Sequence, residues 1–157
     1  MKNLLFALFM FCATVTTTAQ TTINWLSIEE AEQMVVETPK PIMMDIYTEW
    51  CGPCKMLSKS FEDEKVAAFI NANFYAVKFN GELSEPVVFN GKTYDNPDFD
   101  EAKGYKRRNA KNGLTKALKL KGYPTIFIFQ PDDKDHPQEL LGYKAPADLL
   151  VALKAAK

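Results

Sequence analysis

Two cysteines, Cys51 and Cys54, are the residues whose type and spacing most directly indicate chemistry. A Cys-x-x-Cys pair is typical of half a zinc site, a structural disulfide or a redox-active dithiol. Structural zinc needs four ligands, but the single histidine, His136, is distant and Cys12 lies in an N-terminal apolar run. A structural disulfide gains most by closing a long loop, and this pair closes a very short one. We therefore predict a redox pair and no metal site.

The sequence around the pair indicates why one cysteine should be the more reactive. Ile42–Tyr47 is a short, mostly apolar run that predicts a buried strand, and a helix should follow from about Cys51. At a helix start, free N–H groups and the helix dipole stabilise the thiolate that attacks a disulfide. Pro53 suits the first turn of a helix, because the backbone N–H that proline lacks would have no intrahelical partner there. We expect Cys51 to be the nucleophile and Cys54 the resolving thiol.

Helical and strand-like segments alternate along the chain. The expected helices are Ile28–Glu37, Glu64–Asn71, Leu114–Leu120 and one that begins near Pro146. The other expected strands are Phe74–Asn80, Thr125–Phe129 and Glu139–Tyr143. Asn90-Gly91 lies between two strand-like triplets and predicts a hairpin, because both turn positions need positive φ. This order indicates an α/β fold with a sheet covered on both faces.

The first 19 residues have the layout of a secretory signal peptide. Lys2 precedes an apolar run from Leu4 to Val15, and small residues ending in Ala19 follow. The run is shorter than the roughly 20 residues of a membrane span, so we expect cleavage after Ala19, with an uncleaved membrane anchor as the alternative. The domain should then cover residues 20–157 and be exported, either to a periplasm or out of the cell.

Charge gives no sign of a nucleic-acid or membrane-surface partner. Without the first 19 residues, 18 basic and 20 acidic residues remain, a formal charge of −2. One local basic cluster is interpreted as a solvated face: Lys103, Lys106, Arg107, Arg108 and Lys111.

The segment Trp50-Cys51-Gly52-Pro53-Cys54-Lys55 resembles the active-site motif of the thioredoxin family. The likeness covers roughly residues 25–157, apart from an insertion over residues 81–112 before the proline loop. It implies a thioredoxin fold, with a central mixed β-sheet flanked by helices. It also implies that the only redox group is the Cys51–Cys54 disulfide, with no bound cofactor.

Four further positions resemble functional residues of that family. Asp45 resembles its buried acid, and Lys78 the lysine near that acid. Tyr123-Pro124 resembles the loop whose proline is cis and faces the cysteines. Gly142 resembles the glycine that leaves space for the substrate backbone.

The resemblance implies a role for each of these residues. A buried Asp45 should have a raised pKa and could take the proton of Cys54; alternatively, Lys78 merely satisfies its charge. A cis Pro124 would expose the backbone of Tyr123 to an extended substrate. Trp50 would contact the substrate beside Cys51 or serve only packing. The expected substrate-binding residues are Trp50, Gly52, Pro53, Tyr123, Pro124 and Gly142.

Two features depart from the family pattern. The connection over residues 81–112 is far longer than usual, and we expect either a hairpin-bearing flap that narrows partner choice or a tolerated surface elaboration. Tyr123 stands where a smaller aliphatic residue is common in the family; it should touch the substrate, so we expect a different partner preference.

These observations predict a thiol-disulfide oxidoreductase that reduces protein disulfides outside the cytoplasm. Gly52-Pro53 resembles the reducing members of the family. The sequence contains no second redox motif, so electrons should come from a donor protein, such as a membrane disulfide-reductase relay. The alternatives are an oxidase or isomerase, which an oxidising compartment would favour, and a redox-inert binding or chaperone module. We expect a monomer.

Overall fold

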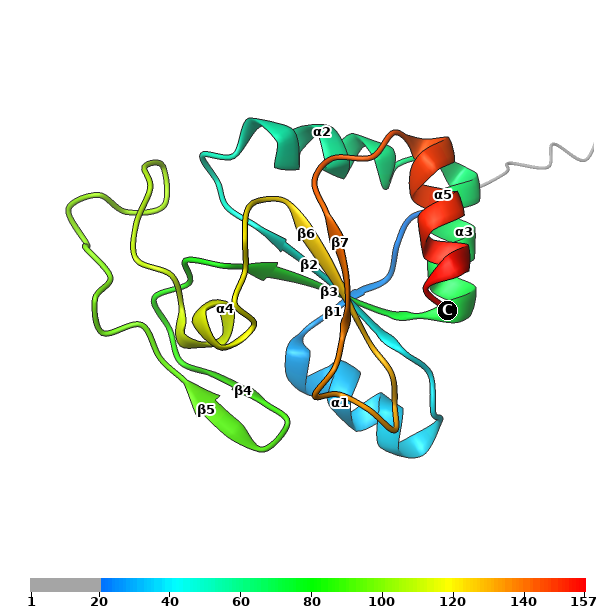
Figure 1. The fold of residues 1–157 in the computed structure, drawn as a ribbon, viewed down its shortest axis with the longest axis horizontal. Coiled ribbons are helices and arrows are strands. Elements are labelled where there is room, and N and C mark those ends of the chain that lie inside the picture. Colours follow the sequence, from blue (N-terminus) through cyan, green and yellow to red (C-terminus); the bar gives the residue numbers. More distant parts are fainter. Residues whose placement is uncertain (1–20) are drawn as a thin grey trace, which may run out of the picture.

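The computed structural model describes residues 21–157 and shows a mixed β-sheet between two layers of helices (Figure 1). The strands are β1 (Trp25–Leu26), β2 (Ile42–Tyr47), β3 (Tyr75–Asn80), β4 (Val87–Phe89), β5 (Lys92–Tyr94), β6 (Thr125–Phe129) and β7 (Gln138–Leu141). The helices are α1 (Ile28–Glu37), α2 (Gly52–Ser60), α3 (Glu64–Asn73), α4 (Gly113–Ala117) and α5 (Pro146–Ala155). The predicted signal peptide lies outside the described residues, and within residues 21–157 no helix is long and apolar enough to cross a membrane.

The main sheet has five strands in the order β1-β3-β2-β6-β7. Strands β1, β3 and β2 run parallel, whereas β6 and β7 are antiparallel to their neighbours. The central position of β2 explains its mostly apolar sequence, because a strand covered on both faces has no polar side. The α/β thioredoxin fold with a mixed sheet is confirmed, and the loop that carries Cys51 leaves from the end of this central strand.

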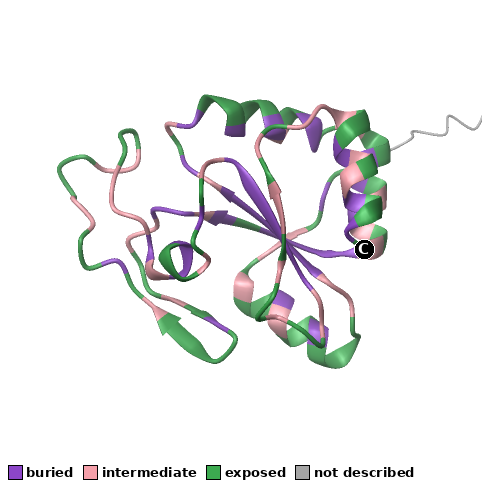
Figure 2. Ribbon diagram, in the orientation of Figure 1, coloured by how far each residue is buried: buried purple, intermediate pink, exposed green. Residues whose placement is uncertain are grey.

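Each face of the sheet carries its own hydrophobic core, and Figure 2 shows that the buried residues follow the strands. Successive side chains of a strand point to opposite faces, so Met43 packs with Leu57 of α2 and Leu149 of α5. Met44 instead packs with Ala31 of α1 on the other face. Helix α2 is thereby fixed over the face to which Asp45 also belongs, two residues after Met43.

Most predicted elements are confirmed, and the differences have local causes. Ser27 and Glu30 form the predicted capping box of α1. Helix α4 ends earlier than expected, and Lys119 just beyond it has a positive φ of 53°. Strand β7 stops at Leu141 because Gly142 has a φ of 82°, which is incompatible with an extended strand. Strand β1 was not predicted, because two residues are too few to show a periodicity.

The insertion over residues 81–112 contains the predicted β4–β5 hairpin, but the hairpin does not lie at the cysteines. It packs beside α1, where the backbone N–H of Asn90 donates to Glu32 at 2.9 Å, and Phe89 meets Phe129 of β6 edge to face. The later part of the insertion returns towards the start of α2 (Figure 1). The part of the insertion that reaches the active site is the segment around Arg108. The expectation that the flap would carry the hairpin is therefore wrong.

Candidate active site

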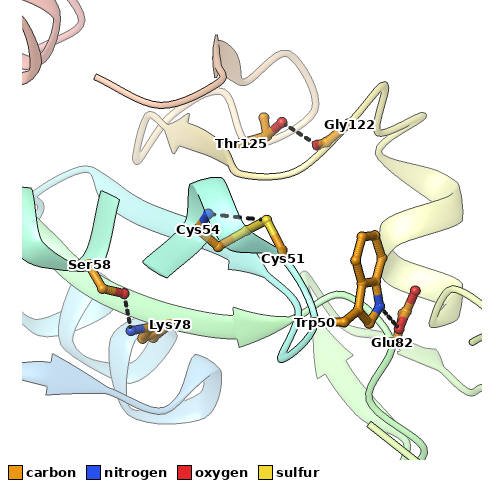
Figure 3. Close-up of a disulfide and its surroundings, with 8 residues drawn as sticks. All are labelled: Trp50, Cys51, Cys54, Ser58, Lys78, Glu82, Gly122 and Thr125. Atoms are coloured by element: carbon orange, nitrogen blue, oxygen red, sulfur yellow. Dashed lines mark hydrogen bonds between the residues drawn. A yellow bond between two sulfur atoms is a disulfide. The ribbon is translucent and has the colours of Figure 1, made fainter. Parts of the chain in front are cut away.

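Cys51 and Cys54 form a disulfide with an S–S distance of 2.05 Å and lie at the start of α2 (Figure 3). Cys51 is the N-cap of this helix, and its Sγ accepts a hydrogen bond from the backbone N–H of Cys54 at 3.1 Å. Pro53 occupies the first turn, as predicted. The same N–H and the helix dipole would stabilise negative charge on the Cys51 sulfur once the disulfide is reduced.

The loop before β6 faces the disulfide. The Tyr123–Pro124 peptide bond is cis, and the Pro124 carbonyl accepts a hydrogen bond from the N–H of Gly142 at 2.9 Å. Thr125 Oγ1 closes the turn by donating to the Gly122 carbonyl at 2.8 Å (Figure 3). Gly142 has open space where a side chain would begin. Three of the residues that the resemblance assigned to substrate binding, Tyr123, Pro124 and Gly142, are thus adjacent in the fold.

A groove of about 440 Å³ runs beside Cys51, and we call it the cysteine groove. Its lining comes from the start of α2, the loop before β6 and the insertion: Trp50, Cys51, Gly52, Pro53, Glu82, Arg108, Asn109, Lys111, Lys121, Gly122 and Tyr123. A larger cavity of about 590 Å³ lies between α1, β3 and β4 and is lined by neither cysteine. We place the active site in the smaller groove because it gives access to the reacting sulfur.

Trp50 is held by contacts on three sides. Its indole N–H donates to the carboxylate of Glu82 at 2.8 Å (Figure 3). Its ring meets Tyr123 edge to face at a centroid distance of 5.8 Å, and the guanidinium of Arg108 lies over it at 4.8 Å. These contacts fix the side chain that precedes Cys51. Trp50 is therefore packed and also lines the groove, and its contact with a substrate stays a prediction.

Tyr123 lies partly buried between Trp50 and the start of the insertion. Burial, together with the carboxylate of Glu82, raises the pKa of its phenol far above the usual value, although Arg108 opposes the shift. A Cβ added to Gly81 would lie 2.7 Å from the Tyr123 hydroxyl, so glycine at this position makes room for the larger residue. This local pairing accommodates the departure from the family pattern at Tyr123.

Asp45 is the buried acid that the sequence predicted, with 1% of its surface exposed. Burial raises its pKa to about 7, while the charge of Lys78 acts in the opposite direction. Its Oδ1 has no hydrogen-bond partner within the described chain. Asp45 therefore sits at the sheet face beneath α2 as a group that can exchange a proton near neutral pH.

Lys78 is paired with Asp45 across β2 and β3 but forms no salt bridge with it within residues 21–157. Its ammonium instead donates to Ser58 Oγ of α2 at 3.0 Å (Figure 3). It also lies 5.1 Å from the ring centre of Tyr47. Lys78 and Cys54 line one small cavity. The structure therefore does not contain a direct ion pair in which Lys78 neutralises the charge of Asp45.

Two residues of the site were not identified from the sequence. Glu82 is only 2% exposed and holds Trp50, yet no local pattern marks an acid 32 residues after the tryptophan it contacts. Arg108 belongs to the basic cluster that was interpreted as a solvated face. That interpretation is incomplete, because Arg108 and Lys111 line the cysteine groove, whereas Lys103 pairs with Asp100 elsewhere.

Comparisons with known proteins agree with this arrangement. The family described as "Thioredoxin-like domain" matches residues 28–157. The chain is 31% identical over 133 residues to the thiol:disulfide interchange protein DsbD of Escherichia coli K12, a match that covers 82% of this chain and 19% of DsbD. The chain thus spans about a fifth of the length of the curated relatives it matches.

Solved structures share the fold at low sequence identity. A thioredoxin from Thermus thermophilus has a TM-score of 0.60 at 17% identity, over 85% of this chain and 86% of that one. The oxidised C-terminal domain of Neisseria meningitidis DsbD has a TM-score of 0.54 at 18% identity, over 82% and 91%. These likenesses concern the fold alone.

Proposed function

Because the chain belongs to the thioredoxin-like family, we propose that it is a thiol-disulfide oxidoreductase that reduces protein disulfides outside the cytoplasm. The observation that carries this proposal is the Cys51–Cys54 disulfide, which lies at the N-terminus of α2 and borders the cysteine groove. A substrate sulfur that enters the groove can reach Cys51, and Cys54 lies one helical turn further along the chain.

The reaction consists of two thiol-disulfide exchanges. In the first, the Cys51 thiolate attacks one sulfur of the substrate disulfide, the substrate S–S bond breaks, and one substrate thiol leaves with a proton. In the second, Cys54 attacks the Cys51 sulfur, the mixed disulfide breaks, and the second substrate thiol leaves. The substrate gains two electrons and two protons, and the dithiol of the enzyme loses them as it becomes a disulfide.

Asp45 assists the second exchange in this proposal. Cys54 must lose its proton to attack, and an acid with a pKa of about 7 is suited to receive it near neutral pH. Asp45 shares its sheet face with Met43, which packs against Leu57 of α2, one turn after Cys54. Lys78 lies near both groups and favours the ionised form of Asp45.

The substrate backbone would lie along the loop before β6. Tyr123 supplies main-chain groups beside the cysteines, and Gly142 leaves open space next to Pro124. An extended segment of a partner protein would therefore pair with Tyr123 while its cysteine reaches Cys51. Trp50, Gly52 and Pro53 form the opposite side of the same groove.

The electron source is proposed to be a donor protein with a reactive dithiol, which returns two electrons to the Cys51–Cys54 disulfide. The similarity to DsbD supports a donor of the membrane disulfide-reductase type, and the signal-like sequence of the first 19 residues supports export. The working form is proposed to be a monomer.

The reduction potential of the Cys51–Cys54 pair tests the direction of electron flow. Equilibration of the purified protein with glutathione buffers should give a value near −270 mV for a reductase. A value of about −180 mV or higher would assign the protein to the oxidases and isomerases instead.

Two serine variants test the order of the two exchanges. Cys54→Ser should accumulate a mixed disulfide with its partner, since Cys51 can attack but no thiol resolves the product. Cys51→Ser should abolish reduction. If Cys51→Ser kept full partner capture and cellular function, a redox-inert binding module would replace the oxidoreductase.

A further inference from the structure

The insertion builds one wall of the cysteine groove, and this wall is basic. Arg108, Asn109 and Lys111 line the groove from the insertion, and Lys121 adds a third cation from the loop before β6. Glu82 is the one acid among the lining residues. Its side chain is almost fully buried, and its carboxylate already accepts the indole N–H of Trp50.

Arg108 is placed to bind an anionic group next to the reacting sulfur. Its guanidinium lies over the Trp50 ring at 4.8 Å, and Trp50 is the neighbour of Cys51 in the chain. The attraction to the ring uses none of the guanidinium's five N–H donors in a conventional hydrogen bond, so these donors are available to an anion. Within residues 21–157, Arg108 has neither a salt bridge nor a side-chain hydrogen bond.

The two lysines of the groove differ in how much charge and how many hydrogen-bond donors they leave for a ligand. Lys121 is paired with Glu139 at 2.9 Å, which neutralises its charge. Lys111 donates to the carbonyl of Leu120 at 3.0 Å, so its ammonium is anchored yet keeps its charge and two further donors. Arg108 and Lys111 therefore supply most of the positive charge that an incoming group would meet.

The backbone that carries these cations is held by side-chain amides, of which Asn96 and Asn112 are buried and Asn109 is partly buried. Asn109 Oδ1 accepts from the N–H groups of Asp100 and Ala110, and Asn96 donates to the Ala110 carbonyl at 2.9 Å. Asn112, fully buried, donates to the carbonyls of Leu83 and Glu85. The cations are thus positioned before a substrate arrives, which lowers the entropy lost on binding.

We propose that Arg108 and Lys111 form a carboxylate subsite, which makes the protein prefer partner proteins with acidic residues next to the reactive disulfide. This inference rests on the proposed function and adds to it a class of substrate. The two cations would contact the partner segment while its cysteine is attacked by Cys51, so the preference belongs to the first exchange.

Two disulfide-linked peptide dimers test the subsite, one with glutamate and one with glutamine on both sides of each cysteine. The protein, reduced and freed of reductant, is mixed with each dimer, and tryptophan fluorescence follows its oxidation. The quantity compared is the ratio of the second-order rate constants, acidic over neutral. Arg108→Gln should lower this ratio about two- to fivefold, the range for one partly exposed ion pair. Salt at 0.5 M should lower the ratio in the unaltered protein.

Arg107→Gln provides the matched control, because it removes the same charge from an exposed neighbour that does not line the groove. Glutamate also changes the intrinsic reactivity of the peptide sulfur, but this effect is the same for every variant and cancels when their ratios are compared. An unchanged ratio in Arg108→Gln, or an equal fall in Arg107→Gln, would overturn the subsite while leaving the oxidoreductase intact. Failure of the unaltered protein to react with either dimer would overturn the proposed function and the subsite together.

Discussion

The indole N–H of Trp50 donates a 2.8 Å hydrogen bond to the carboxylate of Glu82, which joins the neighbour of Cys51 to the start of the insertion. Glu82 Oε2 and Trp50 Nε1 come from segments 32 residues apart. The contact means that the insertion helps to hold the active-site tryptophan, in addition to lining the groove.

Removal of this acceptor should loosen the active site. Glu82→Ala leaves the Trp50 N–H without its partner in a partly buried place and should lower the free energy of unfolding by about 1–3 kcal/mol, measured by urea denaturation. Glu82→Gln, which retains an oxygen acceptor, should lose less. Glu101→Ala, an exposed acid of the same insertion, is the control and should stay within about 0.5 kcal/mol. Equal losses in Glu82→Ala and Glu82→Gln would show that the hydrogen bond is unimportant.

The space between Gly81 and Tyr123 should be sensitive to a single methyl group. Gly81→Ala places a Cβ 2.7 Å from two atoms of the Tyr123 ring system, so the tyrosine must move, at a loss of about 1–3 kcal/mol of stability. In a Tyr123→Ala background the same substitution should cost less, because the one close contact left is that with Ile46 Cγ2 at 3.0 Å. A thermodynamic cycle of the four proteins measures this coupling, and additive losses would contradict it.

Asp45 should make stability depend on pH in a defined direction. Its pKa in the folded protein is about 7, above the ordinary value of 3.8, so folding favours the protonated form. The unfavourable effect on stability is absent below about pH 4, grows as pH rises to 7, and is constant above it. The stability of Asp45→Asn relative to the unaltered protein should therefore rise by on the order of 4 kcal/mol between pH 4 and pH 8.

Urea denaturation of the oxidised protein at several pH values measures this difference. Asp132→Asn, which removes an exposed acid, should follow the unaltered protein at every pH. A difference between Asp45→Asn and the unaltered protein that stays constant from pH 4 to pH 8 would mean that the buried carboxyl does not titrate in this range.

The second exchange should depend on the same carboxyl. Release of the mixed disulfide needs ionised Asp45, which takes the proton of Cys54. The rate of this release should therefore rise as the pH increases through about 7. Asp45→Asn should slow this step on the order of 100-fold at pH 7 and remove that inflection. Rapid-quench analysis of the mixed disulfide separates this step from the first exchange, which should change far less. Retention of the inflection in Asp45→Asn would assign it to another group.

Asn112 should determine whether the insertion is ordered. Its side chain is fully buried, donates to the Leu83 and Glu85 carbonyls and accepts the N–H of Leu114 at 3.0 Å. Asn112→Ala leaves these groups unpaired and should lower stability by about 2–4 kcal/mol. Hydrogen exchange should accelerate across residues 81–112, whereas Lys106→Ala, an exposed change in the same insertion, should leave exchange as it is.

Local patterns were sufficient for most of the secondary structure. The apolar run at Ile42–Tyr47 gave the central strand with its correct ends, because a strand buried on both faces has a distinctive composition. The Asn90-Gly91 turn gave the β4–β5 hairpin, since both residues have positive φ. Strand β1 was not predicted, because its two residues are part of the sheet only through their pairing with β3.

The sequence by itself determined the reacting pair, because Cys51, Pro53 and Cys54 lie within one helical turn whose start and spacing are local properties. Through resemblance it also indicated Asp45 and Pro124. The tertiary structure alone decided that Glu82, Arg108 and Tyr123 surround Trp50. These contacts join segments 32–73 residues apart, and they depend on how the insertion returns to the sheet. A local pattern of residues contains no information about such a return, because burial, packing and long-range hydrogen bonds determine it only when the whole chain has folded.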